Sequence, residues 1–144
     1  MLFGKRKRVV NRILIVEDEP LTAFDNEVML GDLGYEVVAT LDSFEDAIEL
    51  LDRADIDLIL SDYHLSSERN GLDLARAAKI NGIPIVFSTG HKLPPESAEL
   101  ALGCINKPYS ERTLKLALEA VDKRLAGQRA KPPKGMELFI PDEG

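Results

Sequence analysis

The chain has a single cysteine, no tryptophan and no long apolar run among its 144 residues. One cysteine excludes an internal disulfide and a cysteine-rich zinc site, and it fits a reducing compartment such as the cytosol. A helix that spans a bilayer needs about 18 or more consecutive apolar residues. The basic start is followed by only a short apolar run, Ile13–Val16, so it does not predict an export signal. We expect a cytoplasmic protein without a membrane span.

The length suffices for one domain with a hydrophobic core of its own. The net charge of −7 is unevenly distributed, because residues 1–12 carry +5 and no acid, which leaves about −12 for the rest. This acidic body argues against nucleic acid as the main partner. The four adjacent charges of Lys5–Arg8 give at most weak, nonspecific attraction to a phosphate backbone or to anionic lipid. We expect residues 1–11 to form a solvated, mobile basic arm.

Short apolar runs alternate five times with segments of helical periodicity. The expected strands cover about residues 12–16, 35–40, 57–62, 83–88 and 103–106. Strands separated by helix-length segments indicate βαβ units and a parallel sheet. Right-handed crossovers on both faces then give an α/β fold with a doubly wound, five-stranded, flavodoxin-like sheet. Residues 96–102, after a loop with two prolines, have room only for a shortened fourth helix.

Helix starts are marked by Pro20 in a first turn and by Ser43 and Ser110 as N-caps. In the first expected helix, one face carries a recurring set of apolar residues. We expect this face to be buried: Leu21, Phe24, Val28 and Leu33.

Residues 12–126 form the expected folded domain. Residues 127–144 form a tail that contains proline and glycine and is too short for an output domain. Within it, residues 131–135 are typical of a linker, and residues 136–140 are a short apolar segment. This segment is either frayed or docked, on the protein's own surface or on a partner, as an added strand.

Acidic, hydroxyl and amine side chains follow apolar runs at the ends of four expected strands: Glu17, Asp18, Asp62, Thr89 and Lys107. The carboxyl ends of parallel strands meet in the crevice where open α/β sheets bind ligands. The acids are either solvated loop residues or one cluster. Clustered carboxylates repel one another, which a divalent cation or raised pKa values would relieve, and oxygen ligands favour a hard cation such as Mg²⁺.

Three carboxylates, a lysine and a hydroxyl at one edge of a sheet suit a divalent cation and a phosphoryl group. Asp62 is the best candidate for the nucleophile that accepts this group, because it ends a central strand. Its carboxylate would attack phosphorus, while Mg²⁺ and Lys107 neutralise charge on the phosphoryl oxygens. The Lys107 ammonium should point toward the acids, since a buried lysine without a partner is costly. Thr89 would donate its hydroxyl to a phosphoryl oxygen. Ser88 is a rival hydroxyl on the opposite side of the strand.

These motifs, together with Pro108 after Lys107, resemble the receiver domain of two-component response regulators over residues 12–126. The resemblance implies that a histidine kinase or a histidine phosphotransfer protein transfers its phosphoryl group to Asp62. It implies that Mg²⁺ is held by Asp18, Asp62, the backbone carbonyl of His64 and, through a water, Glu17. It also implies a cis Lys107–Pro108 bond.

Some residues depart from the family pattern. Cys104 stands where many receivers have an aromatic switch residue, and we expect it to be a small core residue. The segment Phe87–Gly90 and the short fourth helix resemble single-domain alphaproteobacterial receivers with a Phe-Ala-Thr-Gly motif. Ser88 replaces the alanine of that motif, and Tyr109 stands where phenylalanine usually follows Lys-Pro.

Two histidines flank the expected site: His64 lies two residues after Asp62, and His91 lies two residues after Thr89. Histidines in loops are often simply solvated. The functional alternative is that both line the path of the water that hydrolyses the aspartyl phosphate, and so tune the lifetime of the signal.

The leading prediction is a stand-alone receiver, a monomer or weak homodimer, that signals by protein contact with an unknown target or drains phosphoryl groups from a kinase. It would catalyse its own phosphorylation and dephosphorylation rather than turn over an external substrate. The alternative is a pseudo-receiver scaffold that is never phosphorylated. A phosphatase of the haloacid-dehalogenase type is disfavoured because it needs a second aspartate where this chain has His64.

Overall fold

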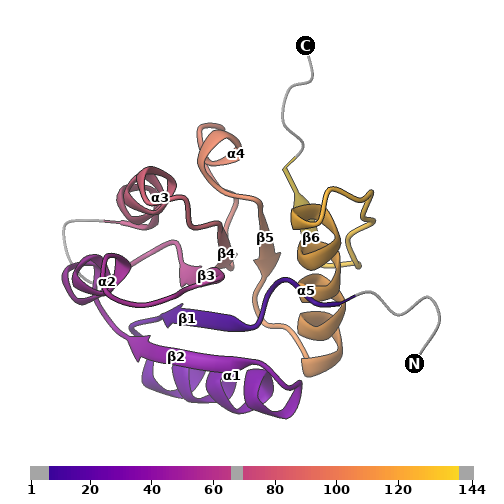
Figure 1. The fold of residues 1–144 in the computed structure, drawn as a ribbon, viewed down its shortest axis with the longest axis horizontal. Coiled ribbons are helices and arrows are strands. Elements are labelled where there is room, and N and C mark those ends of the chain that lie inside the picture. Colours follow the sequence, from indigo (N-terminus) through magenta and orange to yellow (C-terminus); the bar gives the residue numbers. More distant parts are fainter. Residues whose placement is uncertain (1–6, 66–69, 140–144) are drawn as a thin grey trace.

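The computed structural model describes residues 7–65 and 70–139. Strands and helices alternate along the chain. Their bounds are β1 Arg12–Val16, α1 Pro20–Asp32, β2 Glu36–Leu41, α2 Phe44–Leu51, β3 Leu58–Asp62, α3 Gly71–Ile80, β4 Ile85–Thr89, α4 Ser97–Leu100, β5 Gly103–Asn106, α5 Glu111–Leu125 and β6 Met136–Leu138. The strands form one sheet in the order β2-β1-β3-β4-β5-β6, and the first five are parallel (Figure 1). The doubly wound, flavodoxin-like fold with a short fourth helix is confirmed.

The central strands are buried on both sides, because helices cover both faces of the sheet. Ile13 and Ile15 pack on the side of α1 and α5, whereas Leu14 and Val16 pack on the side of α2 and α3. Every residue of β3 and β4 is buried. Strands in such a position are nearly continuous apolar runs, which is why the sequence marks them clearly.

Polar side chains fix the helix starts. Ser43 Oγ accepts from the N–H of Asp46 at the start of α2, and Ser110 Oγ accepts from the N–H of Thr113 at the start of α5, each at 3.1 Å. Both predicted N-caps are confirmed. Each satisfies a backbone N–H that the helix leaves without a partner.

The prediction for the buried face of α1 is wrong at Leu21, Phe24 and Val28, whose exposed fractions are 76%, 62% and 43%. Leu33 does pack against the core. The buried residues of the helix are Ala23, Asn26 and Leu30. The polar Asn26 can face inward because its Oδ1 accepts a hydrogen bond from the Tyr109 hydroxyl at 2.8 Å, which offsets the cost of burying an amide.

The expected N-terminal arm is only partly separate from the domain. The backbone N–H groups of Val9 and Val10 both donate to Asp122 Oδ2 of α5, at 2.9 and 2.8 Å, and Val10 is fully buried. The Arg8 guanidinium lies 4.0 Å from the centre of the Tyr35 ring. The expectation of a solvated arm is therefore wrong for residues 8–10, and residues 1–6 lie outside the described part of the chain.

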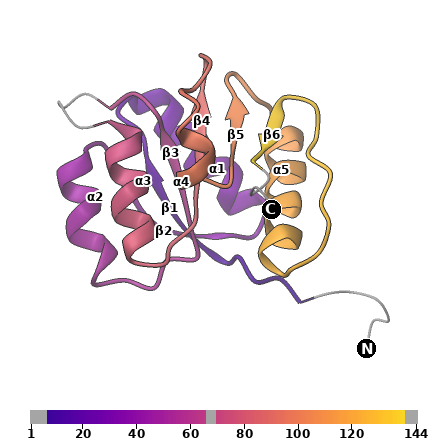
Figure 2. The same ribbon diagram turned by 90° about the horizontal axis from the view of Figure 1, so that it is seen from above.

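The sheet has one strand more than expected, since part of the predicted tail forms β6. This strand pairs antiparallel with β5, and Figure 2 shows the two strands next to each other at the edge of the sheet. Met136 and Leu138 point into the core on the α5 side. Docking on the protein's own surface as an added strand is thus confirmed for Met136–Leu138. The expectation of five strands is wrong because these three residues are too few to show a strand period.

Candidate functional site

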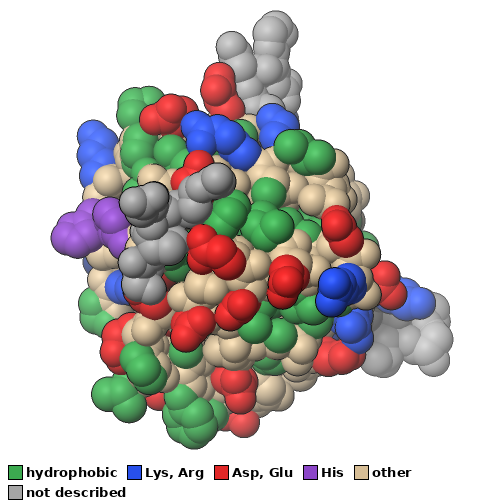
Figure 3. All heavy atoms as spheres, turned by 90° about the vertical axis from the view of Figure 1, so that its left-hand side faces the viewer, with side chains coloured by type: hydrophobic (Ala, Val, Ile, Leu, Met, Phe, Trp, Pro, Cys, Tyr) green, Lys and Arg blue, Asp and Glu red, His purple; other side chains and the backbone are tan. Residues whose placement is uncertain are grey.

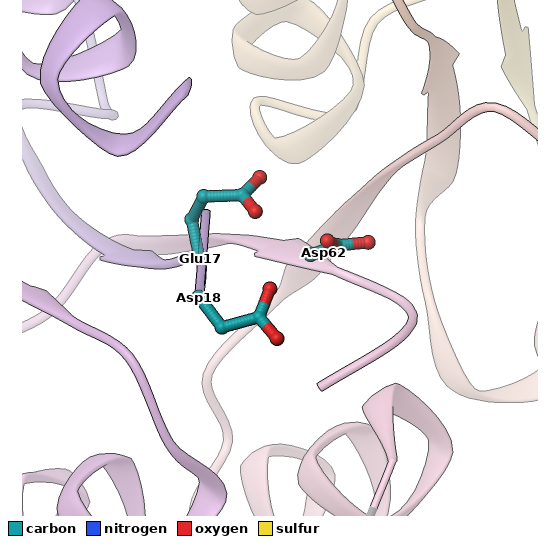
Figure 4. A group of neighbouring side chains, drawn as sticks. All are labelled: Glu17, Asp18 and Asp62. Carbon is teal, nitrogen blue, oxygen red and sulfur yellow. The ribbon is translucent and has the colours of Figure 1, made fainter. Parts of the chain in front are cut away.

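Three carboxylates meet at the carboxyl ends of two neighbouring strands. Glu17 and Asp18 directly follow β1, and Asp62 is the last residue of β3, which pairs with β1. One carboxylate oxygen from each residue lies within 4.8 Å of the others. Figure 4 shows Glu17 and Asp18 extending toward the same space beside Asp62. The parallel register of the two strands therefore brings these acids together.

Lys107, just after β5, completes this cluster. Its Nζ lies 2.9 Å from Glu17 Oε1 and 3.2 Å from Asp62 Oδ2. The bond that follows it, to Pro108, is cis as expected. The backbone N–H of Lys107 donates to the carbonyl of Thr89 at 2.8 Å. The lysine is thus fixed by β4 through its backbone and by the acids through its ammonium.

Burial and charge act against each other in this cluster. Burial raises the pKa of the Glu17 carboxyl, and the charge of Asp62 adds to this, whereas the hydrogen bond from Lys107 opposes it. Burial tends to lower the pKa of Lys107, but the hydrogen bond to Glu17 and the charge of Asp62 outweigh it, so the pKa is raised. One ammonium therefore stays charged against three acids, which leaves an excess of negative charge for a cation to balance.

Thr89 is buried, and its hydroxyl is engaged by its own loop. Thr89 Oγ1 accepts from the N–H of His91 at 3.0 Å and donates to the carbonyl of His91 at 3.1 Å. Its predicted contact with a phosphoryl oxygen therefore requires the hydroxyl to leave the His91 carbonyl. The rival hydroxyl, Ser88, is also buried and contacts the Tyr109 hydroxyl instead.

Tyr109 is a residue whose place beside the site sequence reasoning missed. Besides Ser88, its hydroxyl contacts Asn26 of α1. Burial raises the pKa of Tyr109 to about 12. This hydrogen bond ties α1, which follows Glu17 and Asp18, to the loop that carries Lys107. The sequence carries no signal for this role, because a tyrosine after Lys-Pro does not reveal which polar residue its hydroxyl will bond to.

The two histidines lie together at the mouth of the site. The backbone N–H of His64 donates to Asp62 Oδ1 at 3.1 Å, and the rings of His64 and His91 are 5.6 Å apart between centroids. Both side chains are exposed. Figure 3 shows histidine side chains, in purple, projecting at the left edge of the molecule. The roles of the His64 carbonyl as a metal ligand and of the rings in hydrolysis stay predictions.

Cys104 is a buried residue on β5, and burial raises the pKa of its thiol. An open hollow of about 690 Å³ lies beside it, between the loop after β4 and the strand β6. The small side chain therefore leaves space on this side of the sheet.

Within the described ranges, no helix combines the length and apolar character that crossing a membrane requires.

Comparison with known proteins gives a consistent picture. A family model described as the response regulator receiver domain matches residues 13–119. The chain is 31% identical over 135 residues to the cell cycle transcriptional regulator CtrA of Caulobacter vibrioides, which covers 90% of this chain and 58% of CtrA. It is 26% identical to the chemotaxis protein CheY of Pseudomonas aeruginosa, over 81% of this chain and 99% of CheY. The chain thus spans less than two thirds of the first of these relatives.

Solved structures agree in fold. The response regulator PhyR from Brucella abortus matches this structure with a TM-score of 0.69 at 27% identity. The match covers 84% of this chain and 51% of PhyR. The receiver domain of a sensor histidine kinase from Pseudomonas aeruginosa matches with a TM-score of 0.68 at 26% identity. This match covers 83% of this chain and 99% of that domain. That structure has a magnesium ion coordinated in its active-site cleft.

Proposed function

This chain belongs to the response regulator receiver family of two-component systems, and on that premise we propose that Asp62 accepts a phosphoryl group in a Mg²⁺-dependent reaction. The donor is a phosphohistidine of a sensor histidine kinase or of a histidine phosphotransfer protein. The observation that carries the proposal is the clustering of Glu17, Asp18 and Asp62 around a common space, with Lys107 in contact with two of them.

The donor set fits Mg²⁺. Three carboxylates offer only oxygen ligands, which a hard cation prefers, and the single ammonium of Lys107 does not balance their charge. Asp18 and Asp62 would hold the ion directly together with the carbonyl of His64, and Glu17 would act through a water. When bound, the ion neutralises negative charge on the phosphoryl oxygens.

Asp62 supplies the nucleophile. One of its carboxylate oxygens forms a bond to phosphorus as the bond between phosphorus and the donor's imidazole nitrogen breaks, and the nitrogen keeps the electron pair. Lys107 stands 3.2 Å from Asp62 Oδ2, where its ammonium stabilises charge on the transferred group. Thr89 then exchanges its hydrogen bond to the His91 carbonyl for one to a phosphoryl oxygen, which moves the loop after β4.

The output is contact with another protein or removal of phosphoryl groups from a kinase. The chain is a phosphoacceptor that catalyses its own phosphorylation and dephosphorylation, rather than an enzyme with an external substrate. The single-domain subgroup with the Phe-Ala-Thr-Gly motif, the monomeric or weakly dimeric state and the cytoplasmic location belong to this proposal.

Intact-mass measurement after incubation with Mg²⁺ and a small-molecule phosphodonor tests the function. The wild type should gain the mass of one phosphoryl group, and Asp62→Asn should gain none. Asp52→Asn is the matched control, because Asp52 is an exposed acid that follows α2, and it should be labelled like the wild type. Labelling of Asp62→Asn would move the acceptor elsewhere, and no labelling of the wild type would favour the pseudo-receiver scaffold.

A further inference from the structure

The edge of β5 is covered by the chain's own C-terminal strand. Met136, Glu137 and Leu138 of β6 lie opposite Ile105, Cys104 and Gly103. Two backbone hydrogen bonds of 2.8 Å extend the pairing, from the N–H of Asn106 to the carbonyl of Gly135 and from the N–H of Phe139 to the carbonyl of Leu102. Without β6, this row of backbone groups would be open for pairing with another strand.

Gly103 is matched to a strand on this edge. A Cβ atom at Gly103 would clash with the carbonyl oxygen of Glu137 and would lie 3.1 Å from the Cα of Leu138, and its three nearest atoms all belong to β6. Glycine in a strand often marks a place where another backbone approaches closely. The absence of a side chain at this position is therefore a requirement of the strand that binds at the edge, not of the core beneath it.

The chain's own strand fits the two sides of this edge unequally. On the α5 side, Met136 and Leu138 are buried in the core. On the other side, Glu137 is exposed, and its negative charge adds to burial in raising the pKa of the Cys104 thiol. The open hollow of about 690 Å³ lies there, lined by Leu93, Pro94, Cys104, Glu137 and Phe139 among others. A charged residue thus occupies a position where an apolar one would fill space.

The strand is also weakly held. It has three residues, and residues 128–134, between α5 and Gly135, contain no helix or strand. The buried Met136 and Leu138, the partly buried Phe139, a few backbone hydrogen bonds and one hydrogen bond from Arg124 work against the conformational entropy of ordering this segment. A short element with few buried contacts opens at low free energy compared with the whole domain.

We propose that the edge of β5 is a binding site for an extended segment of a partner protein, and that β6 occupies this site as a displaceable strand. The partner segment runs antiparallel to β5, has apolar residues at the positions of Met136 and Leu138, and carries an apolar residue in place of Glu137, which fills the hollow beside Cys104. This mode of recognition adds a strand to a sheet edge, with affinity from the backbone and specificity from alternate side chains. It goes beyond the phosphoacceptor function and does not depend on it.

Peptide binding to full-chain variants tests the site without phosphorylation. Leu138→Asp places a charge at a buried position and releases β6 while leaving the edge intact. Gly103→Ala releases β6 and also blocks the edge. The probe is a synthetic peptide with the sequence Lys134–Phe139, and a second probe carries the change Glu137→Val. Glu137→Asp in the protein is the control for Leu138→Asp, because it introduces the same residue on the exposed side of the strand.

Leu138→Asp should bind the peptide at least about tenfold more tightly than the wild type or Glu137→Asp, a difference of about 1.4 kcal/mol. The Glu137→Val peptide should bind more tightly than the first, and Gly103→Ala should bind neither. Equal binding to Leu138→Asp and Gly103→Ala, or binding to neither, would overturn the proposal. A wild type that is dimeric by light scattering, through exchange of β6 between copies, would replace the partner protein with a second copy of this chain and also overturn it.

A second measurement needs no variant. In the wild type, the amide of Phe139 donates to the carbonyl of Leu102, just before β5. It should exchange its hydrogen at least about tenfold faster than the amide of Leu102, which donates to the carbonyl of Ile85 of β4 at 2.9 Å. Equal protection of the two amides would show that β6 opens only with the whole domain, which contradicts a displaceable strand even if Leu138→Asp fails to fold.

Discussion

Replacing Tyr109 with phenylalanine removes one hydroxyl and keeps the ring. That hydroxyl donates to Asn26 Oδ1 at 2.8 Å, and Asn26 is only 2% exposed. The variant therefore leaves a buried amide oxygen without this donor. A buried polar atom that loses its partner costs about 1–3 kcal/mol. We expect Tyr109→Phe to lower the free energy of unfolding by about 1–2 kcal/mol at about pH 8.

This difference should shrink as the pH rises, because burial raises the pKa of Tyr109 from 10.0 to about 12. A group whose pKa is higher in the folded state contributes stability that is complete below its unfolded pKa and is lost as the pH rises through the folded one. Between about pH 8 and about pH 11 the wild type loses about 1.4 kcal/mol that the phenylalanine variant cannot lose. The two proteins should then be nearly equal in stability.

Urea unfolding followed by circular dichroism at the two pH values measures both quantities. Asn26→Leu is the control, because this background has no amide oxygen to leave unpaired. There Tyr109→Phe removes only the contact with Ser88, so its effect at about pH 8 should be smaller than in the wild type. Equal stability of the wild type and Tyr109→Phe at that pH would refute the contribution of the hydrogen bond. A constant difference at both pH values would refute the effect of burial on the titration.

Three further outcomes are expected. Replacing both His64 and His91 with alanine should change the rate at which phosphorylated protein loses its phosphoryl group, and an unchanged rate would exclude a role in hydrolysis. Saturating Mg²⁺, at about 100 times its dissociation constant, should stabilise the wild type by about 2.7 kcal/mol in thermal unfolding; an equal gain in Asp18→Asn would remove Asp18 from the metal site. Ser110→Ala should lower the free energy of unfolding by about 1 kcal/mol through loss of the cap on Thr113, and unchanged urea unfolding would contradict that assignment.

The fold and the acidic cluster could be predicted because their signals are local. Strands buried on both faces, such as β3 and β4, are continuous apolar runs with few alternative interpretations. A carboxylate directly after such a strand must lie at the carboxyl edge of the sheet. The convergence of Glu17, Asp18 and Asp62 follows from strand order alone, and Lys107 follows because it needs partners for its charge.

The remaining features depend on contacts between distant residues. The buried face of α1 was misjudged because Asn26 is polar by type and becomes suited to the interior only through Tyr109, far along the chain. The same holds for β6, whose three residues gain their conformation from β5 rather than from their own pattern. Val9 and Val10 likewise depend on Asp122, an acid whose partners in the N-terminal segment the sequence does not reveal.

Helix α5 holds the segment that precedes β1 and the segment that follows β6. Asp122 accepts from the backbone N–H groups of Val9 and Val10, and two residues later Arg124 donates to the carbonyl of Phe139 at 3.3 Å. Fraying of the last turns of α5 would therefore loosen Val9 and Val10, which precede β1, and Phe139, which follows β6, in a single event. The two flanks lie far apart in the sequence, yet both lose a contact when this part of the helix opens, whereas β6 also opens while the helix stays folded.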